Sequence, residues 1–484
     1  MRRSTNLVLA GLAAALAAAA PRARATDVTT FGYDLQRTGL NPAEAVLGTG
    51  NVGSLAPRWS ARVGGAILTQ PLVATRVATA GGPRDLVYVG SRRGGLGFAA
   101  LDRTTGALVW HNALGARGND LLHGVVGTPT LDRARRAVYV ATFGDDLHAL
   151  NEATGAELPG WPVHLTPAGL TSDRVFGGLT LAGGRVYAEV AGQADQPPYR
   201  GEVIAVDTAS HTIARTWYPE GASGPSGGGL WGMGGVSVEP DGSAVYGATG
   251  NGLGADEHAA FFEQVVRLTP TLKLQAANYP GLVGHDVDFG ATPLPYQARG
   301  CPARLAVMNK TGALLVYDRA AIGEGPRQRL QMADSRFSAA GDFIGVPAYD
   351  PARKLVYVNN PSDSKDGAFK HGLVALRVGA DCDLGVAWQT VLGPPRKPGQ
   401  EHASIPPTVA NGVVYAVRSV DSVVYALDAV TGAQLWSSGT RITGGIFGAV
   451  TVANGQLLVP AVNGTLYAFT PPAAGMPRGV ARVN

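Results

Sequence analysis

A short pattern recurs along most of this chain and limits what the chain can fold into. Each copy has an apolar stretch containing Val-Tyr, then Ala-Leu-Asp, then Thr-Gly, and finally a tryptophan. The clearest copies occupy residues 86–110 and 414–436. Because Val and Tyr favour strands and Asp, Thr and Gly favour tight turns, each copy predicts a small antiparallel sheet.

The positions of the copies predict how many sheets there are. Eight candidate third strands end near residues 102, 151, 207, 268, 318, 377, 428 and 470, about 42 to 61 residues apart. This spacing is typical of the four-stranded blades of a β-propeller. The eighth copy lacks a tryptophan strand, and residues 57–63, which contain Trp59, look like the missing strand. We therefore predict an all-β, eight-bladed propeller of four-stranded blades, closed by this N-terminal strand, because closure removes exposed sheet edges.

The first 25 residues have the pattern of a secretory signal peptide. Arg2 and Arg3 precede an apolar run over residues 7–20, and Ala23-Arg24-Ala25 fits a cleavage site. The run is too short to span a bilayer, and no later stretch is long and apolar enough. We therefore expect a periplasmic or secreted protein with no membrane span. The expected regions are a signal peptide (1–25), an N-terminal segment (26–56), the propeller (57–471) and a C-terminal tail (472–484).

Charge and cysteine content exclude some functions. The net charge of +4 matches four arginines in the leader, which has no acidic residue, so the mature chain is close to neutral. Nucleic acid is therefore not an expected partner. The two cysteines, Cys301 and Cys382, could form a structural disulfide or remain as two buried thiols. No Cys-x-x-Cys-His motif is present, so the sequence predicts no attached c-type haem.

The repeat Ala-Leu-Asp-x-x-Thr-Gly-x-x-x-Trp resembles the tryptophan-docking repeat of pyrroloquinoline-quinone (PQQ) propeller proteins, over essentially the whole mature chain. That family includes quinoprotein alcohol dehydrogenases, among them the polyvinyl-alcohol dehydrogenase-like group. It also includes non-enzymatic propellers such as the outer-membrane assembly lipoprotein. Residues 31–42 and 51–59 resemble the opening segments of the dehydrogenases.

Four motifs in the middle of the chain resemble the cofactor site of these dehydrogenases. The resemblance implies that Trp231 lies beneath PQQ, Asn251 binds calcium, Asp288 is the catalytic base and Lys310 reaches the quinone carbonyls. These residue types suit the chemistry, because a flat quinone stacks on an aromatic ring and a hard cation takes oxygen ligands. A carboxylate can accept the proton of an alcohol while hydride passes to the quinone.

Charged residues in the turns between second and third strands are expected to point to one face of the propeller. Arg93 and Arg418 lie in such turns, and we expect them to contact the carboxylated cofactor. A mixed-charge funnel of this kind suits PQQ with a cation, although polar turns are also common in any propeller.

The chain departs from the dehydrogenases at two places. Their adjacent Cys-Cys pair above the quinone is replaced here by Pro197-Pro198. Their metal-binding glutamate is also missing; Asp195 is the nearest carboxylate, with Glu189 as a second candidate. The expected metal ligands are therefore Asn251, Asp195 and Asp288.

Together these features favour an exported PQQ-dependent dehydrogenase without a cytochrome c domain. It would oxidise a simple or polymeric alcohol and pass electrons to a separate soluble cytochrome c or cupredoxin. The alternative is a non-catalytic PQQ-like propeller that acts as a binding or assembly scaffold, because the repeat alone does not distinguish the two.

Overall fold

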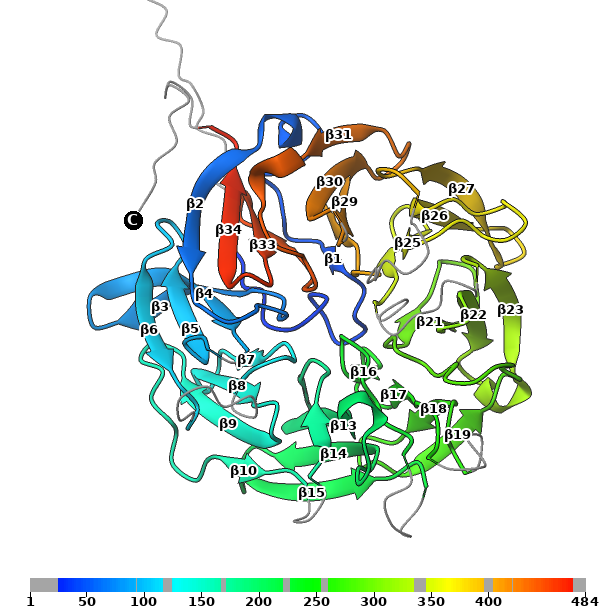
Figure 1. The fold of residues 1–484 in the computed structure, drawn as a ribbon, viewed down its shortest axis with the longest axis horizontal. Helices are drawn as coiled ribbons and strands as arrows, with labels where there is room; N and C mark the ends of the chain where they lie inside the picture. Colours follow the sequence, from blue (N-terminus) through cyan, green and yellow to red (C-terminus); the bar gives the residue numbers. More distant parts are fainter. Residues whose placement is uncertain are drawn as a thin grey trace, which may run out of the picture.

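Eight small sheets surround a common axis in the computed structural model of this chain (Figure 1). The structure describes residues 25–92, 94–115, 124–166, 171–220, 227–253, 260–334, 345–395, 404–419 and 421–472. The prediction of an all-β, eight-bladed propeller of four-stranded blades is confirmed. Most of the predicted signal peptide and C-terminal tail lie outside the described residues.

The first four blades follow one another along the chain. Blade 1 contains β3 (Leu72–Thr79), β4 (Gly82–Gly90), β5 (Phe98–Asp102) and β6 (Leu108–Asn112). Blade 2 contains β7 (Thr130–Asp132), β8 (Ala137–Ala141), β9 (Asp146–Asn151) and β10 (Val163–His164). Blade 3 contains β11 (Asp173–Val175), β12 (Thr180–Ala182), β13 (Arg185–Gly192), β14 (Glu202–Asp207) and β15 (Thr212–Trp217). Blade 4 contains β16 (Ser237–Val238), β17 (Val245–Ala248), β18 (Val265–Leu268) and β19 (Leu274–Asn278).

The other four blades complete the ring. Blade 5 contains β20 (Leu294–Tyr296), β21 (Arg304–Met308), β22 (Ala313–Asp318) and β23 (Pro326–Gln331). Blade 6 contains β24 (Ala348–Asp350), β25 (Leu355–Asn360), β26 (Gly372–Val378) and β27 (Leu384–Thr390). Blade 7 contains β28 (Thr408–Ala410), β29 (Val413–Arg418), β30 (Val423–Asp428) and β31 (Gln434–Ser437). Blade 8 contains β32 (Thr451–Ala453), β33 (Gln456–Pro460), β34 (Thr465–Thr470) and β2 (Ala56–Arg62).

Helical structure is confined to single turns in the part of the chain that is described. The four short 3₁₀ segments are η1 (Val52–Ser54), η2 (Gln193–Asp195), η3 (Ile322–Glu324) and η5 (Gly439–Arg441). None of the helices among the described residues is long and apolar enough to cross a bilayer.

Blade 8 is built from both ends of the described chain. Strand β2 pairs antiparallel with β34, so that Trp59 lies opposite Ala468, and the blue β2 runs beside the red β34 in Figure 1. The predicted N-terminal closing strand is therefore confirmed. Strand β2 covers the edge of β34 and completes blade 8 as a four-stranded sheet.

Tryptophans of one blade dock onto the Thr-Gly turn of the next blade. A Cβ built on Gly106 (φ +75°) would lie 2.6 Å from the Trp59 ring, and one on Gly155 would lie 2.3 Å from the Trp110 ring. The Trp110 indole N–H also donates to the carbonyl of Glu152 at 3.1 Å. Only glycine fits under these rings, which explains why Thr-Gly and Trp recur together in the sequence.

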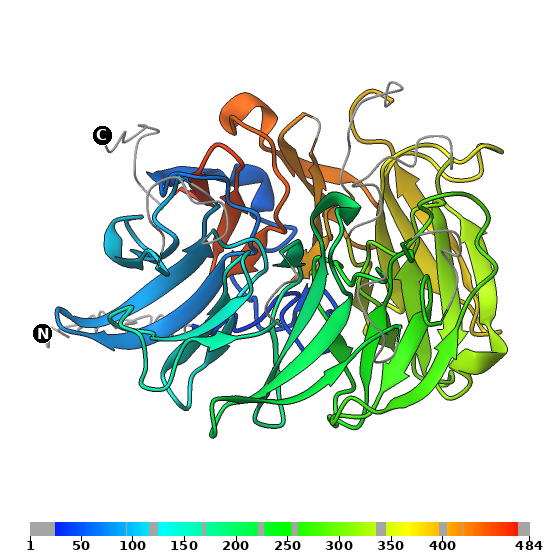
Figure 2. The ribbon, with the colours of Figure 1, turned by 60° about the horizontal axis from the view of Figure 1, so that its bottom comes forward.

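The N-terminal segment crosses the middle of the ring, where it is the dark blue trace in Figures 1 and 2. Main-chain and side-chain groups between residues 28 and 39 form hydrogen bonds to all eight blades. The partners are Val73 (blade 1), Leu131 (blade 2), Leu179 and Thr180 (blade 3), Val238 (blade 4), Pro295 (blade 5), Tyr349 (blade 6), Val409 (blade 7) and Val452 (blade 8). In addition β1 (Leu40–Asn41) pairs in parallel with β28.

Arg37 is the most deeply buried charged side chain of this N-terminal segment. It is 1% exposed, and its guanidinium donates to the Phe31 carbonyl at 2.9 Å and the Leu179 carbonyl at 3.2 Å, and also to the hydroxyls of Thr30 and Thr180. Burial lowers the pKa of Arg37 to about 10, so the guanidinium stays charged at neutral pH. Arg37 therefore joins the segment to blade 3 through a charged, multiply bonded group.

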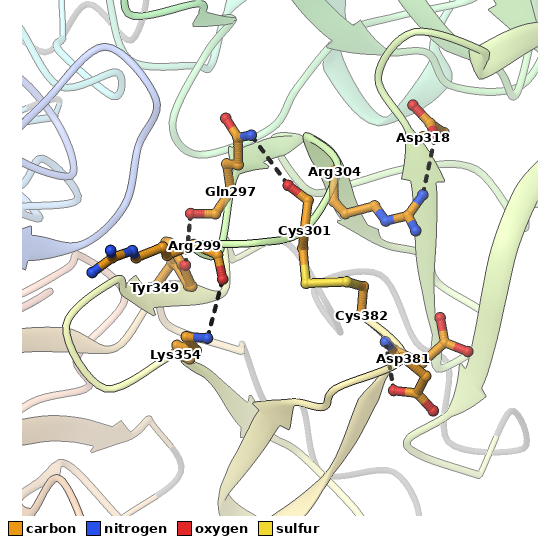
Figure 3. The surroundings of a disulfide bond; sticks show 10 residues. Gln297, Arg299, Cys301, Arg304, Asp318, Tyr349, Lys354, Asp381 and Cys382 are labelled. Carbon is orange, nitrogen blue, oxygen red and sulfur yellow. Dashed lines mark hydrogen bonds and ion pairs between the residues drawn. A yellow bond between two sulfur atoms is a disulfide. The ribbon is translucent and has the colours of Figure 1, made fainter.

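The two cysteines form a disulfide (Figure 3). Cys301, which follows β20 of blade 5, bonds to Cys382, which precedes β27 of blade 6, across 81 residues of sequence. The alternative of two buried thiols is therefore wrong for this structure. The bond ties two neighbouring blades together outside their strands.

Candidate functional site

A cavity of about 240 Å³ opens where blades 3, 4 and 5 meet near the axis. Its wall is formed by turns at one end of the strands, which we call the site face. This face includes the β13–β14 connection, the β17–β18 connection and the β21–β22 turn. The lining residues are Phe176, Ala191, Gly192, Ala194, Asp195, Gly229, Trp231, Gly250, Asp288 and Lys310.

Asp288 lies at the centre of the charged part of this cavity. Its side chain is 3% exposed; Oδ2 accepts a hydrogen bond from Trp231 Nε1 at 2.9 Å, and Oδ1 lies 2.6 Å from Lys310 Nζ. Burial raises the pKa of Asp288, while the ammonium of Lys310 acts in the opposite direction. The carboxylate is thus held in place at both oxygens.

Lys310 is placed by the turn between β21 and β22. Its backbone N–H donates to the Asp288 carbonyl at 3.2 Å, and the neighbouring Asn309 side chain donates to the same carbonyl at 2.9 Å. The ammonium lies 2.5 Å from Asp286 and 5.0 Å from the centre of the Trp231 ring. Although burial disfavours its charge, the two carboxylates together raise the pKa of Lys310, which is therefore a cation.

Two glycines leave room for these side chains. A Cβ on Gly250 would lie 2.9 Å from Asp288 Oδ2, and a Cβ on Gly290 would lie 2.4 Å from the Trp231 ring. Any larger residue at either position would displace the carboxylate or the indole. The open cavity above Trp231 and Asp288 therefore depends on glycine at these positions.

A set of oxygen donors borders the same cavity. Asn251 follows the lining residue Gly250, is 7% exposed, and its buried Oδ1 has no hydrogen-bond partner among the described residues. Asp195 lines the cavity and accepts a hydrogen bond from the Tyr199 hydroxyl at 2.8 Å. Within the described ranges, no three His, Cys, Asp or Glu side chains converge closely enough to hold a metal. A calcium ion here would therefore need amide, water or cofactor oxygens to complete its six to eight ligands.

Aromatic and basic side chains lie beside the lining residue Phe176. Its ring is edge-on to Phe143 at 5.0 Å, and the guanidinium groups of Arg92 and Arg174 each lie 5.5 Å from the centre of the Phe143 ring. Arg174 is held by Gln193, whose side-chain oxygen accepts from its Nε at 3.2 Å. One wall of the cavity is thus apolar and backed by positive charge.

The structure brings together most of the residues predicted from the sequence. Trp231, Asp195, Asp288 and Lys310 line one cavity. Arg418 does not line it; the Arg418 guanidinium donates to the Leu392 carbonyl at 2.5 Å and pairs with Asp421 in blade 7. Arg93 lies outside the described residues.

Two other predicted positions lie off the cavity wall. Pro197 and Pro198 are exposed, and neither is among the lining residues. Glu189 is 2% exposed on β13, two residues from the lining residue Ala191. Burial raises the pKa of Glu189 to about 8, and Arg37 acts against this.

Asp286 and Phe176 were missed from the sequence. Asp286 lies two residues before Asp288 in the same motif, and this nearness to the proposed base is the signal that could have found it. Phe176 lies in the interruption between β11 and β12, and no sequence pattern marked that interruption.

The chain belongs to the PQQ-repeat β-propeller family. The family profile described as outer membrane protein assembly factor BamB matches residues 53–249 and 383–473, which together exceed half of the chain. The part between these stretches contains Asn251, Asp288 and Lys310.

Similarity to individual known proteins covers more of the chain than the family profile does. A polyvinylalcohol dehydrogenase from a Pseudomonas species is 23% identical over an aligned length of 438 positions, and the alignment covers 78% of this chain and 65% of that protein. The chain therefore spans just under two thirds of the length of this relative. The solved quinohemoprotein alcohol dehydrogenase from Comamonas testosteroni aligns with a TM-score of 0.68 and 16% identity over 96% of this chain and 83% of its own. A europium-containing methanol dehydrogenase aligns with a TM-score of 0.65 and 17% identity over 92% of this chain and 98% of its own. At these identities the two solved structures show a shared fold.

Proposed function

We propose that this protein is an exported PQQ-dependent dehydrogenase that oxidises an alcohol. The observation that carries the proposal is the hydrogen-bonded group formed by Trp231, Asp288 and Lys310 at the wall of one cavity. The similarity to a polyvinylalcohol dehydrogenase over 438 residues supports it.

The cavity suits a flat, polar ring. The Trp231 face offers a stacking surface, and Lys310 offers a donor to carbonyl oxygens next to that face. When bound, the quinone would supply the hydride acceptor. Arg93 stays a predicted cofactor contact, and Arg418 would need to leave its present partners to become one.

Asp288 is the proposed base. A general base must reach the hydroxyl proton and keep a lone pair free, and each Asp288 oxygen has one partner in the structure. The ammonium of Lys310 acts against the rise in the pKa of Asp288 that burial causes, and Trp231 holds the orientation of the carboxylate. The carboxylate of Asp288 would then take the proton of the alcohol hydroxyl.

Calcium is the proposed metal. The Asp286 and Asp288 carboxylates pair with the ammonium of Lys310, and the Asp195 carboxylate lines the same cavity. The buried and unpartnered Asn251 Oδ1 supplies a neutral oxygen donor. Asn251, Asp195 and Asp288 would hold the ion, and its charge would polarise a carbonyl beside it.

The predicted leader over residues 1–25 supports a periplasmic or secreted location. A simple or polymeric alcohol is the proposed substrate, by similarity to the polyvinylalcohol dehydrogenase. A soluble cytochrome c or cupredoxin is the proposed electron acceptor, because the sequence has no haem-attachment motif.

A non-catalytic assembly scaffold is the second candidate, favoured by the description of the matching family profile. That match covers the repeats on either side of residues 250–382, whereas Asn251, Asp288 and Lys310 lie between the matched stretches. The scaffold function gives no reason for a buried carboxylate and a lysine of this unmatched part to pair at the wall of a cavity.

The deciding experiment measures dye-linked alcohol oxidation and the melting temperature, with and without added PQQ and Ca²⁺. We expect activity and a higher melting temperature only when both are present. Asp288→Asn should lower turnover by about 10²- to 10⁴-fold while the fold is retained. Asp207→Asn, at an exposed turn of blade 3, is the control. Absence of both activity and thermal shift would favour the scaffold.

A further inference from the structure

The connection between β13 and β14 brings Asp195 to the wall of the site cavity. We call this connection, residues 193–200, the strap. Its first turn has a backbone conformation that side chains other than glycine rarely adopt, because Ala194 and Asp195 have φ angles of +50° and +53°. Two adjacent left-handed residues without glycine are unfavourable unless neighbouring groups hold them. The position of Asp195 therefore depends on the contacts of the strap.

Hydrogen bonds hold both ends of the strap against the start of β11. At the first end, the Gln193 backbone N–H donates to the Ser172 carbonyl at 3.0 Å. At the second end, the Ser172 N–H donates to the Pro198 carbonyl at 3.3 Å. The backbone N–H of Arg200 also donates to Asp173 Oδ1 at 2.9 Å. The strap is therefore fixed to blade 3, but none of these bonds involves the side chain that lines the cavity.

The Asp195 side chain is held by another residue of the strap, Tyr199. The Tyr199 hydroxyl donates to Asp195 Oδ1 at 2.8 Å, and this is the one side-chain hydrogen bond of Asp195 within the described residues. Tyr199 is 1% exposed, and its ring packs over Gly192, where a Cβ would lie 2.3 Å from the ring. The buried ring therefore fixes the position of the hydroxyl. Because Asp195 is itself exposed, its carboxylate would rotate freely without this bond.

The Tyr199 hydroxyl lies within electrostatic range of the charged centre of the cavity. Burial raises the pKa of Tyr199, and the carboxylates of Asp195, Asp288 and Asp286 act in the same direction. The hydroxyl therefore keeps its proton at neutral pH and acts as a donor. Because it occupies Oδ1 of Asp195, the lone pairs of Oδ2 are left available to a positive group in the cavity.

We propose that Tyr199 is a positioning residue that sets the direction of the Asp195 carboxylate, so that Asp195 serves as a cation ligand of the cavity. This inference rests on the proposed function, because the cation is the calcium ion proposed above. A carboxylate whose rotation is already restricted loses less entropy when the ion binds. Tyr199 touches neither the ion nor the cofactor, and it acts through Asp195 alone.

The test is a calorimetric titration of Ca²⁺ into the full-length protein in the presence of saturating PQQ. Tyr199→Phe keeps the buried ring and removes only the hydroxyl. We expect this variant to bind Ca²⁺ about 3- to 10-fold more weakly, which is the effect of one lost hydrogen bond. The melting temperature of the ligand-free protein should stay nearly unchanged. Turnover at saturating Ca²⁺ should be retained, because a higher concentration of the ion compensates for the weaker binding.

Two further variants separate positioning from a general effect on structure. Tyr187→Phe is the matched control, because it removes a hydroxyl that donates to the Pro270 carbonyl at 2.7 Å, and Tyr187 does not line the cavity. It should leave the affinity for Ca²⁺ unchanged. Asp195→Ala should weaken Ca²⁺ binding more than Tyr199→Phe does. Adding Tyr199→Phe to Asp195→Ala should cause no further loss, because a positioning residue has no effect once the group that it positions is absent.

The outcomes distinguish this inference from the proposed function. If the wild-type protein binds Ca²⁺ and Tyr199→Phe binds it equally well, the inference is overturned while the proposed calcium site stands. Additive losses in the Asp195→Ala, Tyr199→Phe double variant would show that Tyr199 does not act through Asp195, which also overturns it. If the wild-type protein binds no Ca²⁺ in the presence of PQQ, the proposed calcium site fails and the inference fails with it.

Discussion

The indole N–H of Trp231 donates to Oδ2 of Asp288 at 2.9 Å, so the aromatic floor and the charged centre of the cavity form one hydrogen-bonded unit. Lys310 binds the other oxygen of the same carboxylate at 2.6 Å. A change in any one of these three residues therefore affects the orientation or the charge of Asp288.

Trp231→Phe separates stacking from hydrogen bonding. Phenylalanine keeps an aromatic face but leaves Asp288 Oδ2 without its donor, so we expect turnover to fall about tenfold. The dissociation constant of PQQ should change less than turnover does. Steady-state kinetics and cofactor titration check this, with Trp217→Phe on the outer strand of blade 3 as control. A larger effect on cofactor binding than on turnover would contradict the orienting role.

Lys310→Met leaves the Asp288 carboxylate buried without its cation. We expect the free energy of unfolding to fall by about 3 kcal/mol in urea titrations at neutral pH. Adding Asp288→Asn to this variant should recover much of the loss, because the uncompensated charge is removed. Additive losses in the double variant would show that the two side chains do not act as a pair.

Arg37→Met tests the N-terminal segment. The substitution removes bonds to the Phe31 and Leu179 carbonyls and leaves these buried acceptors unsatisfied. We expect a loss of about 2–4 kcal/mol in the free energy of unfolding. Arg62→Met, at an exposed position of β2, should change it by less than about 0.5 kcal/mol. Equal effects of the two substitutions would count against a structural role for Arg37.

The buried carboxyl group of Glu202 should make the free energy of unfolding depend on pH. It is 1% exposed, its carboxylate oxygens have no hydrogen-bond partner among the described residues, and burial beside Asp173 raises its pKa to about 8. Because the folded state then holds its proton more tightly than the unfolded state, this stabilising contribution is complete below about pH 4.5 and is lost as pH rises towards 8.

Glu202→Gln should therefore raise the free energy of unfolding at pH 8 by about 1–3 kcal/mol and leave it nearly unchanged at pH 4.5. Urea titrations at both pH values measure this difference. A gain of the same size at both pH values would show that ionisation of Glu202 is not its cause.

The blades could be predicted because the contacts between neighbouring blades require particular residue types, which recur in the sequence. Trp110 needs a glycine beneath its ring, and that glycine is Gly155 in the next copy of the repeat. The same reasoning identified Trp59 as part of the strand that completes blade 8. Trp231, Asp288 and Lys310 were recognised through the family resemblance, and the structure places them on one cavity.

Other features left no such pattern. The N-terminal segment binds most blades through its backbone, and backbone hydrogen bonds do not depend on residue type, so neither the path of the segment nor the burial of Arg37 was predicted. Arg418 lies in a turn of the expected kind, but its long side chain reaches Asp421 and the Leu392 carbonyl instead of the cavity. Position in a turn does not determine where a flexible side chain points.

The path of residues 28–39 also constrains the order in which the molecule can assemble. This segment is synthesised before the blades, yet its hydrogen-bond partners extend to Val409 and Val452. It can find all of them only after nearly the whole chain has emerged, and β2 must likewise wait for β34. Residues 28–39 and β2 therefore reach their final positions after the blades between them have formed, and the ring is complete only when β2 pairs with β34.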